Sequence, residues 1–149
     1  MIPFAVLSVV TLLLRALGLA GLSAFASWDS SLRGGLAAMF LLTASAHWGR
    51  RRPDLIRMVP SAFPRPDRIV TITGVLEILG AAGLLLPFTA RLAAACLAVL
   101  LLAMFPANIR ATRHHLSIGG QPATALGPRT LLQVVFLSAL AFVALGPFS

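Results

Sequence analysis

Acidic residues and cysteine are scarce in this chain of 149 residues, and lysine is absent. The acids are Asp29, Asp54, Asp67 and Glu77, against twelve arginines. The single cysteine, Cys96, lies within an apolar run, so the chain has neither a disulfide framework nor a Cys-x-x-Cys pair. Thiol–disulfide exchange within the chain is therefore excluded.

Motifs for nucleotide binding, acyl transfer or metal binding are also missing. The sequence contains no Gly-x-Gly-x-x-Gly, no phosphate loop and no nucleophile–base arrangement. His114 and His115 are adjacent, so their side chains diverge, and no other His or Cys completes a zinc site. A bis-histidine haem would need His47 and one of this pair, whose position in a loop argues against it. We expect no metal and no resident cofactor, with a bound quinone compatible with the residues below.

Apolar residues dominate what is present. They make up 58% of the chain, and its mean hydropathy is +0.94, whereas soluble domains are roughly 45–50% apolar. The net charge of +8 would suit nucleic acid. However, the arginines lie between apolar runs rather than on one basic face studded with aromatic residues. The composition therefore predicts an integral membrane protein whose partner is the lipid bilayer and not a nucleic acid.

Five apolar stretches approach the roughly 17–25 residues that a membrane-spanning helix needs. The first could instead be a signal peptide, because Ala24-Phe25-Ala26 resembles a cleavage site. Its start carries no basic residue and Arg15 interrupts it, so we expect a retained helix. No soluble domain is left over, and residues 1–149 are expected to form one all-α, polytopic membrane bundle of five transmembrane helices. The stretches run over about 3–26, 32–48, 69–86, 90–108 and 130–145.

The connections between these stretches differ in length and charge. The corners at 27–31 and 87–89 are short, whereas the connections at 49–68 and 109–129 are long and basic. With the N-terminus on the side of the long connections, that side has nine arginines and the other has Arg33 and Arg91. The positive-inside rule then places the N-terminus in the cytoplasm and the C-terminus outside.

Glu77 and Arg15 are the charged residues expected deep in the membrane. Glu77 lies near the middle of its stretch, where a carboxylate marks a functional site by default. The alternative is a protonated glutamate that ties two helices together. Arg15 is expected at a matching depth, and Glu77 is the only acid able to pair with it; alternatively, Arg15 snorkels to the interface. Gly74, Gly80 and Gly83 should let another helix approach Glu77's helix closely.

A second polar set is expected at the cytoplasmic end of the bundle. It comprises His47, with Thr43 one turn deeper, Asn108 after Pro106, and Gln133. Imidazole and amide groups converging on a pocket in the membrane could hydrogen-bond a quinone-type carbonyl. Each residue could equally be an ordinary tie between helices. We therefore take Glu77, His47, Asn108, Arg15 and Gln133 as candidate ligand-binding residues.

Several motifs resemble the DoxX family of bacterial membrane proteins over residues 33–145. They are His47-Trp48, Met58-Val59-Pro60, Phe63-Pro64-Arg65-Pro66, Thr73-Gly74-Val75-Leu76-Glu77, Leu85-Leu86-Pro87, Arg91, Phe105-Pro106-Ala107-Asn108-Ile109 and the start of the last helix from Arg129 to Gln133. The resemblance implies a bacterial cytoplasmic membrane and a four-helix core, to which the helix within residues 1–28 is an addition. It singles out His47, Glu77 and Asn108. Without a cysteine pair, the thiol chemistry of a member would not transfer.

The family takes its name from a subunit of a thiosulfate:quinone oxidoreductase, and other members are linked to membrane redox complexes. The resemblance therefore implies an accessory subunit of a quinone-linked redox system, with a membrane protein or a second copy as its partner. Two alternatives stay open. One is a quinone-linked oxidoreductase in its own right. The other is a small transporter or proton pathway that uses Glu77, although no inverted repeat is evident.

Overall fold

The fold is all-α apart from one two-residue β pairing, as seen in a computed structural model that describes residues 2–118, 120–122 and 125–146. Ser117–Ile118 pairs antiparallel with Gln121–Pro122. This bears out the predicted all-α class. The elements are α1 (Ile2–Leu19), the 3₁₀ turn η1 (Ser23–Phe25), α2 (Trp28–Ser45), α3 (Arg52–Met58), α4 (Pro66–Leu85), α5 (Ala90–Arg113), β1 (Ser117–Ile118), β2 (Gln121–Pro122) and α6 (Leu126–Leu145).

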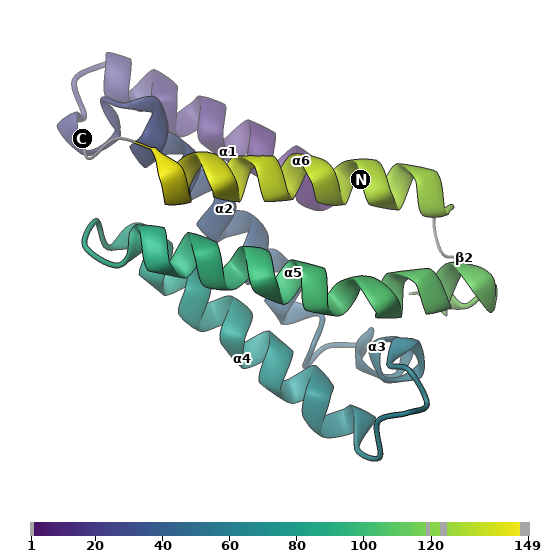
Figure 1. The fold of residues 1–149 in the computed structure, drawn as a ribbon. Coiled ribbons are helices and arrows are strands. Elements are labelled where there is room, and N and C mark those ends of the chain that lie inside the picture. The colour runs from purple at the N-terminus through teal and green to yellow at the C-terminus, as the bar shows by residue number, and fades with distance from the viewer. Residues whose placement is uncertain (1, 119, 123–124, 147–149) are drawn as a thin grey trace.

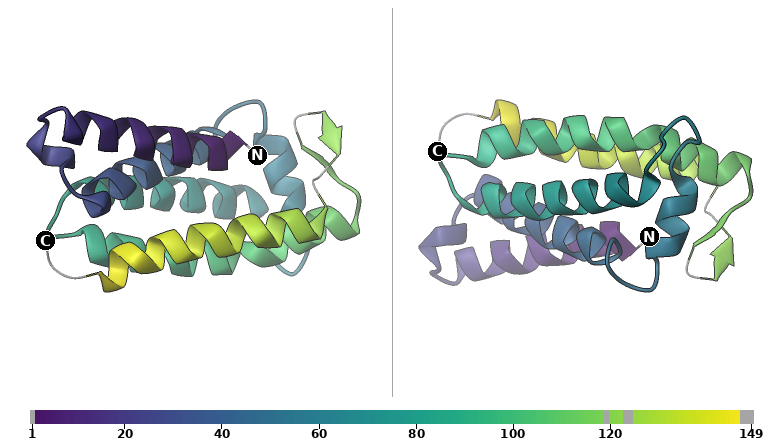
Figure 2. Two further views of the ribbon diagram at one scale, coloured as in Figure 1. Left: turned by 90° about the horizontal axis from the view of Figure 1, so that it is seen from above. Right: turned by 90° about the horizontal axis from the view of Figure 1, so that it is seen from below.

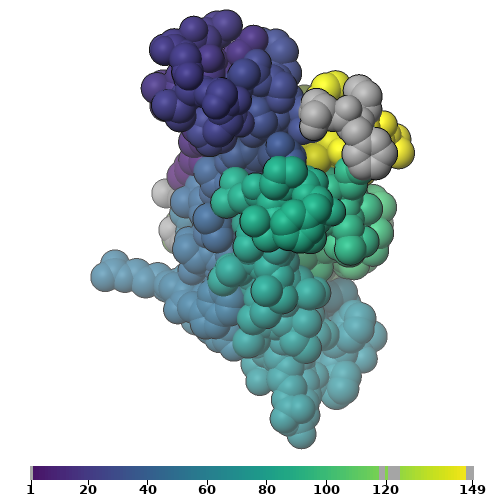
Figure 3. Space-filling view, turned by 90° about the vertical axis from the view of Figure 1, so that its left-hand side faces the viewer, coloured from purple at the N-terminus to yellow at the C-terminus, as the bar shows by residue number. Residues whose placement is uncertain are grey.

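The five long helices run up and down in an elongated bundle (Figure 1). The start of α1, the short helix α3 and the β1–β2 hairpin lie at one end, and α6 finishes at the other (Figure 2). The second end is formed by the α1–α2 connection, the α4–α5 corner and the end of α6 (Figure 3). The long basic connections therefore share one end of the bundle with the start of the chain.

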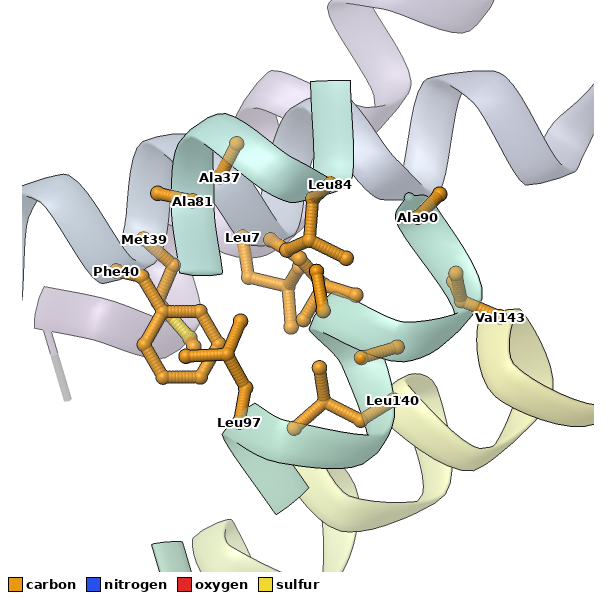
Figure 4. Close-up of a cluster of buried hydrophobic side chains, with 13 residues drawn as sticks. Leu7, Ala37, Met39, Phe40, Ala81, Leu84, Ala90, Leu97, Leu140 and Val143 are labelled. Atoms are coloured by element: carbon orange, nitrogen blue, oxygen red, sulfur yellow. The ribbon is translucent and has the colours of Figure 1, made fainter. Parts of the chain in front are cut away.

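Helix α2 is the centre of the bundle and packs against α1, α4 and α6. Its buried face alternates small and large side chains, from Gly34 and Gly35 to Met39 and Phe40. Side chains from α4, α5 and α6 meet this face in the core, among them Leu84, Leu97 and Leu140 (Figure 4). Because α2 is covered by protein, its sequence can be less apolar than those of its neighbours.

Four helices of the described chain are long and apolar enough to cross a membrane, namely α1, α4, α5 and α6. Most of the residues in their apolar windows face outward, as expected where lipid is the solvent. Helix α2 is not among them, because Asp29, Arg33 and several serines lower its hydropathy. Its charges are compensated: Arg33 Nε lies 3.2 Å from Asp29 Oδ2 one turn away.

Several helix boundaries depart from those expected, and three departures are the largest or have a clear local cause. Helix α1 ends at Leu19 rather than near residue 26, and Gly21 follows with a φ of 112°, which favours glycine. Helix α2 begins at Trp28 because the Ser27 side chain accepts a hydrogen bond from the amide of Ser30 and caps it. Helix α5 continues through Pro106 to Arg113 instead of ending at residue 108.

The short helix α3 was not expected within the basic connection. Pro53 stands in its first turn, where the missing N–H costs nothing, and Asp54 adds a favourable negative charge there. Asp54 also pairs with Arg57 one turn later. The first-turn proline and the favourable charges therefore stabilise α3, in a segment whose composition predicts a loop.

Candidate functional site

Glu77 lies in the middle of α4 and is buried, with 3% of its surface exposed. Its Oε2 atom is 2.9 Å from the hydroxyl of Thr43, near the end of α2. The same hydroxyl is 3.0 Å from the carbonyl oxygen of Phe40. The Thr43 hydroxyl donates to Glu77 Oε2 and can share its proton with the carbonyl oxygen of Phe40 in a three-centre hydrogen bond. When the Glu77 carboxyl group is neutral, this arrangement leaves the carboxyl proton free to donate to a ligand.

His47 lies two residues beyond the end of α2, in the turn that leads toward α3, and is 3% exposed. Its Nδ1 atom is 3.2 Å from the carbonyl oxygen of Thr43 and 3.9 Å from Glu77 Oε2. Burial lowers the pKa of His47 below its ordinary value of 6.5; backbone hydrogen bonds at Thr43 and Ala44 raise it, and the charge of Arg52 lowers it. A neutral imidazole with Nδ1–H donating to Thr43 leaves Nε2 as an acceptor.

Arg52 fixes the turn that carries His47. Its guanidinium donates to the carbonyl oxygen of His47 at 2.7 Å, to that of Asp67 at 3.2 Å and to the hydroxyl of Thr71 at 2.9 Å. The first acceptor belongs to the turn after α2, and the other two belong to α4. One planar donor therefore joins the two segments that hold His47 and Glu77.

Gly74 brings the same turn against α4. A Cβ at this position would lie 2.7 Å from Cβ of His47 and 2.8 Å from the ring of Trp48. Gly80 and Gly83 have the same function toward α5, where a Cβ would lie within 2.8 Å of side chains of Leu97 and Ala93. The predicted close approach of another helix is confirmed at Gly80 and Gly83, whereas at Gly74 the approaching segment is the turn that follows α2.

A cavity of about 540 Å³ lies beside Glu77, Thr43 and His47. This volume falls within the roughly 300–1,000 Å³ range of small-molecule sites. Its wall is otherwise mostly apolar, with Arg50 and Arg51 at the rim, at the end of the bundle where α1 begins. The apolar lining comes from five segments and includes Pro3, Met39, Phe40, Leu101, Met104 and Phe136.

A larger groove of about 860 Å³ runs along the outer surface between α4 and α5. Its lining includes Cys96 and the hydroxyl of Thr89, and no charged side chain. Thr89 is already bonded to the carbonyl oxygen of Gly83. The groove thus offers little that would orient a ligand, and the smaller cavity is the candidate site.

Asn108 and Gln133 do not line this cavity but connect α5 to α6. Gln133 donates to the carbonyl oxygen of Leu101 at 3.0 Å, and Asn108 accepts from Arg129 at 2.9 Å. At the far end of the same pair, Arg91 donates to the carbonyl oxygen of Gly146. The expected convergence of His47, Asn108 and Gln133 on one pocket is wrong, because the two amides are used within the α5–α6 pair.

The predicted ion pair between Arg15 and Glu77 is also wrong. Arg15 donates to the carbonyl oxygen of Ala26 at 2.9 Å and lies over the ring of Trp28, 5.4 Å from its centroid. Glu77 instead meets Thr43, fifteen residues along α2 from Trp28, which is about 22 Å of helix. Because α1 ends at Leu19, Arg15 stands near the end of its helix, and its side chain reaches the connection between α1 and α2.

Sequence reasoning missed Arg52 and the apolar wall of the cavity. Nothing in the run Arg50-Arg51-Arg52 separates the third arginine from its neighbours, so the whole run was assigned to topology. Phe40 and Phe136 follow the hydropathy of their helices and are indistinguishable from ordinary core residues. Only the packing of α2 against α4 and α6 reveals these roles.

Residues 36–144 match a family described as a domain of unknown function, DUF8561. The match includes Thr43, His47, Arg52 and Glu77 and leaves α1 outside. No curated protein matched the chain, and no solved structure did. The matched residues span most of the bundle, and this chain belongs to the DUF8561 family.

Proposed function

We propose that the chain spans the bacterial cytoplasmic membrane five times, with its N-terminus inside. Helix α2 is the fifth span and crosses inside the bundle, where α1, α4 and α6 shield it from lipid. Its polar residues have local partners: Ser31 donates to carbonyl oxygens of Phe25 and Ser27, and Arg33 pairs with Asp29. The basic connections at the end where α1 begins support the orientation.

We further propose that the cavity beside Glu77 binds the head of a quinone-type ligand. The observation that carries this proposal is the Glu77–Thr43 hydrogen bond at the wall of a mostly apolar cavity. A quinone head is neutral, flat and apolar, with two oxygens that need hydrogen bonds. A protonated carboxyl group can donate to a carbonyl, and Nε2 of a neutral His47 can accept from the hydroxyl of the reduced form.

The role that fits such a site is that of an accessory subunit in a membrane redox system. The resemblance to DoxX proteins supports it, because two of the residues that the resemblance singles out, His47 and Glu77, line the cavity. The third, Asn108, is engaged with Arg129 and contributes to the α5–α6 pair. In this role the chain holds or hands over the quinone, and a partner supplies the electrons.

Binding of a benzoquinone with a ten-carbon tail tests the site. Quenching of Trp48, whose ring centroid is 6.1 Å from that of His47, reports binding. Thr43→Val removes the hydroxyl between Glu77 and Phe40 and should weaken binding about tenfold, the equivalent of one hydrogen bond of ~1–1.5 kcal/mol. Thr73→Val is the matched control, since the Thr73 hydroxyl bonds to carbonyl oxygens of its own helix. Equal affinity in the two variants, or no binding by the native chain, would refute the site.

Purification in mild detergent tests the role. A membrane protein whose absorbance shows flavin, haem or iron–sulfur groups should co-purify with the chain. The quinone-reductase activity of that complex should be lower when the chain carries Thr43→Val. A solitary chain that itself reduces the quinone would establish the oxidoreductase alternative instead. Proton flux through vesicles that depends on Glu77, without quinone binding, would establish the transporter alternative.

A further inference from the structure

The cavity reaches both the first and the last helix of the bundle. Helix α1 packs against α2, and α6 packs against α5 and less extensively against α2. Seen from above, α1 and α6 lie on the same side of the bundle with α2 behind them (Figure 2, left). The same cavity is lined by Ile2 of α1, Phe40 of α2 and Phe136 of α6. The part of the cavity between the start of α1 and α6, here called the crevice, therefore continues to the wall that carries Thr43 and Glu77.

The lining remains apolar where it reaches the outer surface. Leu42 and Ile2 both line the cavity, yet they are 38% and 58% exposed. Ile2 belongs to α1, and Leu42 belongs to the end of α2, where the neighbouring helices leave part of α2 uncovered. A molecule dissolved in the bilayer would thus meet hydrocarbon from the surface of the bundle to the inner wall.

The cytoplasmic end of the cavity is positively charged, unlike the rest of its lining. It is formed by Gly49, Arg50, Arg51 and Leu55, in the segment that Arg52 fixes to α4. A neutral, water-insoluble molecule would have to pass two guanidinium groups there. Desolvating those charges costs far more than parting two apolar helix faces.

We propose that the cavity is filled from the cytoplasmic leaflet of the bilayer, through the crevice between α1 and α6, by a neutral amphiphile with a hydrocarbon tail. This inference rests on the proposed function and concerns the route and class of its ligand. The head reaches Glu77 and His47, and the tail stays in the crevice beside Leu42. Arg50 and Arg51 mark the level of the headgroups, where they contact lipid phosphates.

Quenching of the fluorescence of single tryptophans can test this entry route without a known ligand. In a Trp28→Phe, Trp48→Phe background, Phe40→Trp places the fluorophore at the cavity wall. Two controls make the same substitution elsewhere: Phe142→Trp on the outer face of α6, where the native residue is 54% exposed, and Phe63→Trp in the cytoplasmic connection, where it is 51% exposed. Vesicles of phospholipid with brominated acyl chains quench from the bilayer, and iodide quenches from water.

Phe40→Trp should lose fluorescence in brominated vesicles, as Phe142→Trp does, and should resist iodide, which quenches Phe63→Trp. Quenching by iodide with none from the brominated chains would show an aqueous route and overturn the proposal, as would protection from both. If Phe40→Trp does not fold, Phe136→Trp probes the opposite wall. Binding of the quinone probe is measured separately, so a chain that is open to lipid but does not bind the probe refutes the proposed function and not the route.

Discussion

Gly74 is the residue on which the position of His47 most directly depends. Gly74→Ala would place a methyl group 2.7 Å from Cβ of His47, so the turn must move away from α4. We expect a loss of about 1–3 kcal/mol of stability, as for other overpacked sites, and weaker binding of the quinone probe. Thermal unfolding in detergent and a binding titration measure the two effects.

Gly127→Ala is the control for this substitution, because a Cβ at Gly127 meets nothing within 4 Å. It lies in the first turn of α6, and its melting temperature should stay unchanged or rise slightly through helix propensity. A Gly74→Ala protein as stable as Gly127→Ala, with normal probe binding, would show that the turn is free to shift.

Arg15 and Glu77 should behave as independent residues. Arg15→Leu removes one carbonyl hydrogen bond and the contact with Trp28, whereas Glu77→Leu removes the partner of Thr43. Their losses in stability should add within about 0.3–0.5 kcal/mol, as is usual for distant sites. A double-mutant cycle in one detergent measures this. Recovery of stability in the double variant would mean that the two side chains do meet.

The depth of a charged residue could not be read from residue counts alone. The sequence correctly marks Glu77 as buried, because it stands well inside a long apolar run. It misplaces Arg15, because the apolar run continues past Leu19 through a turn that ends the helix. Distance along a chain measures depth only where the helix boundaries are known.

At the scale of elements, the contact between α4 and α5 offers a paired test. A Cβ at Gly80 would lie 2.5 Å from Cγ and Cδ2 of Leu97, a side chain that is 1% exposed. Gly80→Ala should therefore cost about 1–3 kcal/mol, and Leu97→Ala about 2–5 kcal/mol through the cavity it leaves. In the double variant the new methyl group occupies part of that cavity. The stability lost by the double variant, measured by thermal unfolding, should be smaller than the sum of the losses of the two single variants. An additive loss would show that α4 and α5 move apart instead of filling the cavity.

Hydropathy predicted the long helices better than the elements at their ends. All four of the most apolar helices were predicted, because lipid exposure demands a long apolar run, although the ends of α1 and α5 were misplaced by more than one turn. The start of α2 and the whole of α3 depend on caps and first-turn prolines, such as Ser27 and Pro53. Such signals are brief and resemble ordinary turns. The cavity depends on how α2 packs against its neighbours, which no local pattern encodes.

At the scale of the whole molecule, the proposed orientation predicts which loops reach each side of the membrane. In a Cys96→Ala background, Ser61→Cys lies in the basic connection after α3, and Phe88→Cys lies in the corner between α4 and α5. Phe88 is 84% exposed, so its replacement should be accessible. In intact spheroplasts an impermeant maleimide should label Phe88→Cys and spare Ser61→Cys.

Opening the membrane supplies the control for this experiment, since both cysteines should then react. Labelling of Ser61→Cys but not of Phe88→Cys in intact spheroplasts would mean that the orientation is the reverse of the one proposed. Labelling of both positions before opening would mean that α4 does not cross, which is incompatible with five spans.

Three polar contacts between the described parts of α5 and α6 have a consequence for how the two helices enter the membrane during synthesis. They stand at the start, middle and end of the pair, through Arg91, Gln133 and Arg129. Pro106 has no N–H to bond the carbonyl oxygen of Leu102, and Gln133 donates to the adjacent carbonyl oxygen of Leu101. During synthesis α5 leaves the ribosome before α6 can supply these groups. The translocon should therefore hold α5 until α6 arrives and release the two helices into the lipid together. A nascent chain arrested before residue 126 should remain beside the translocon, exposed to quality-control proteases.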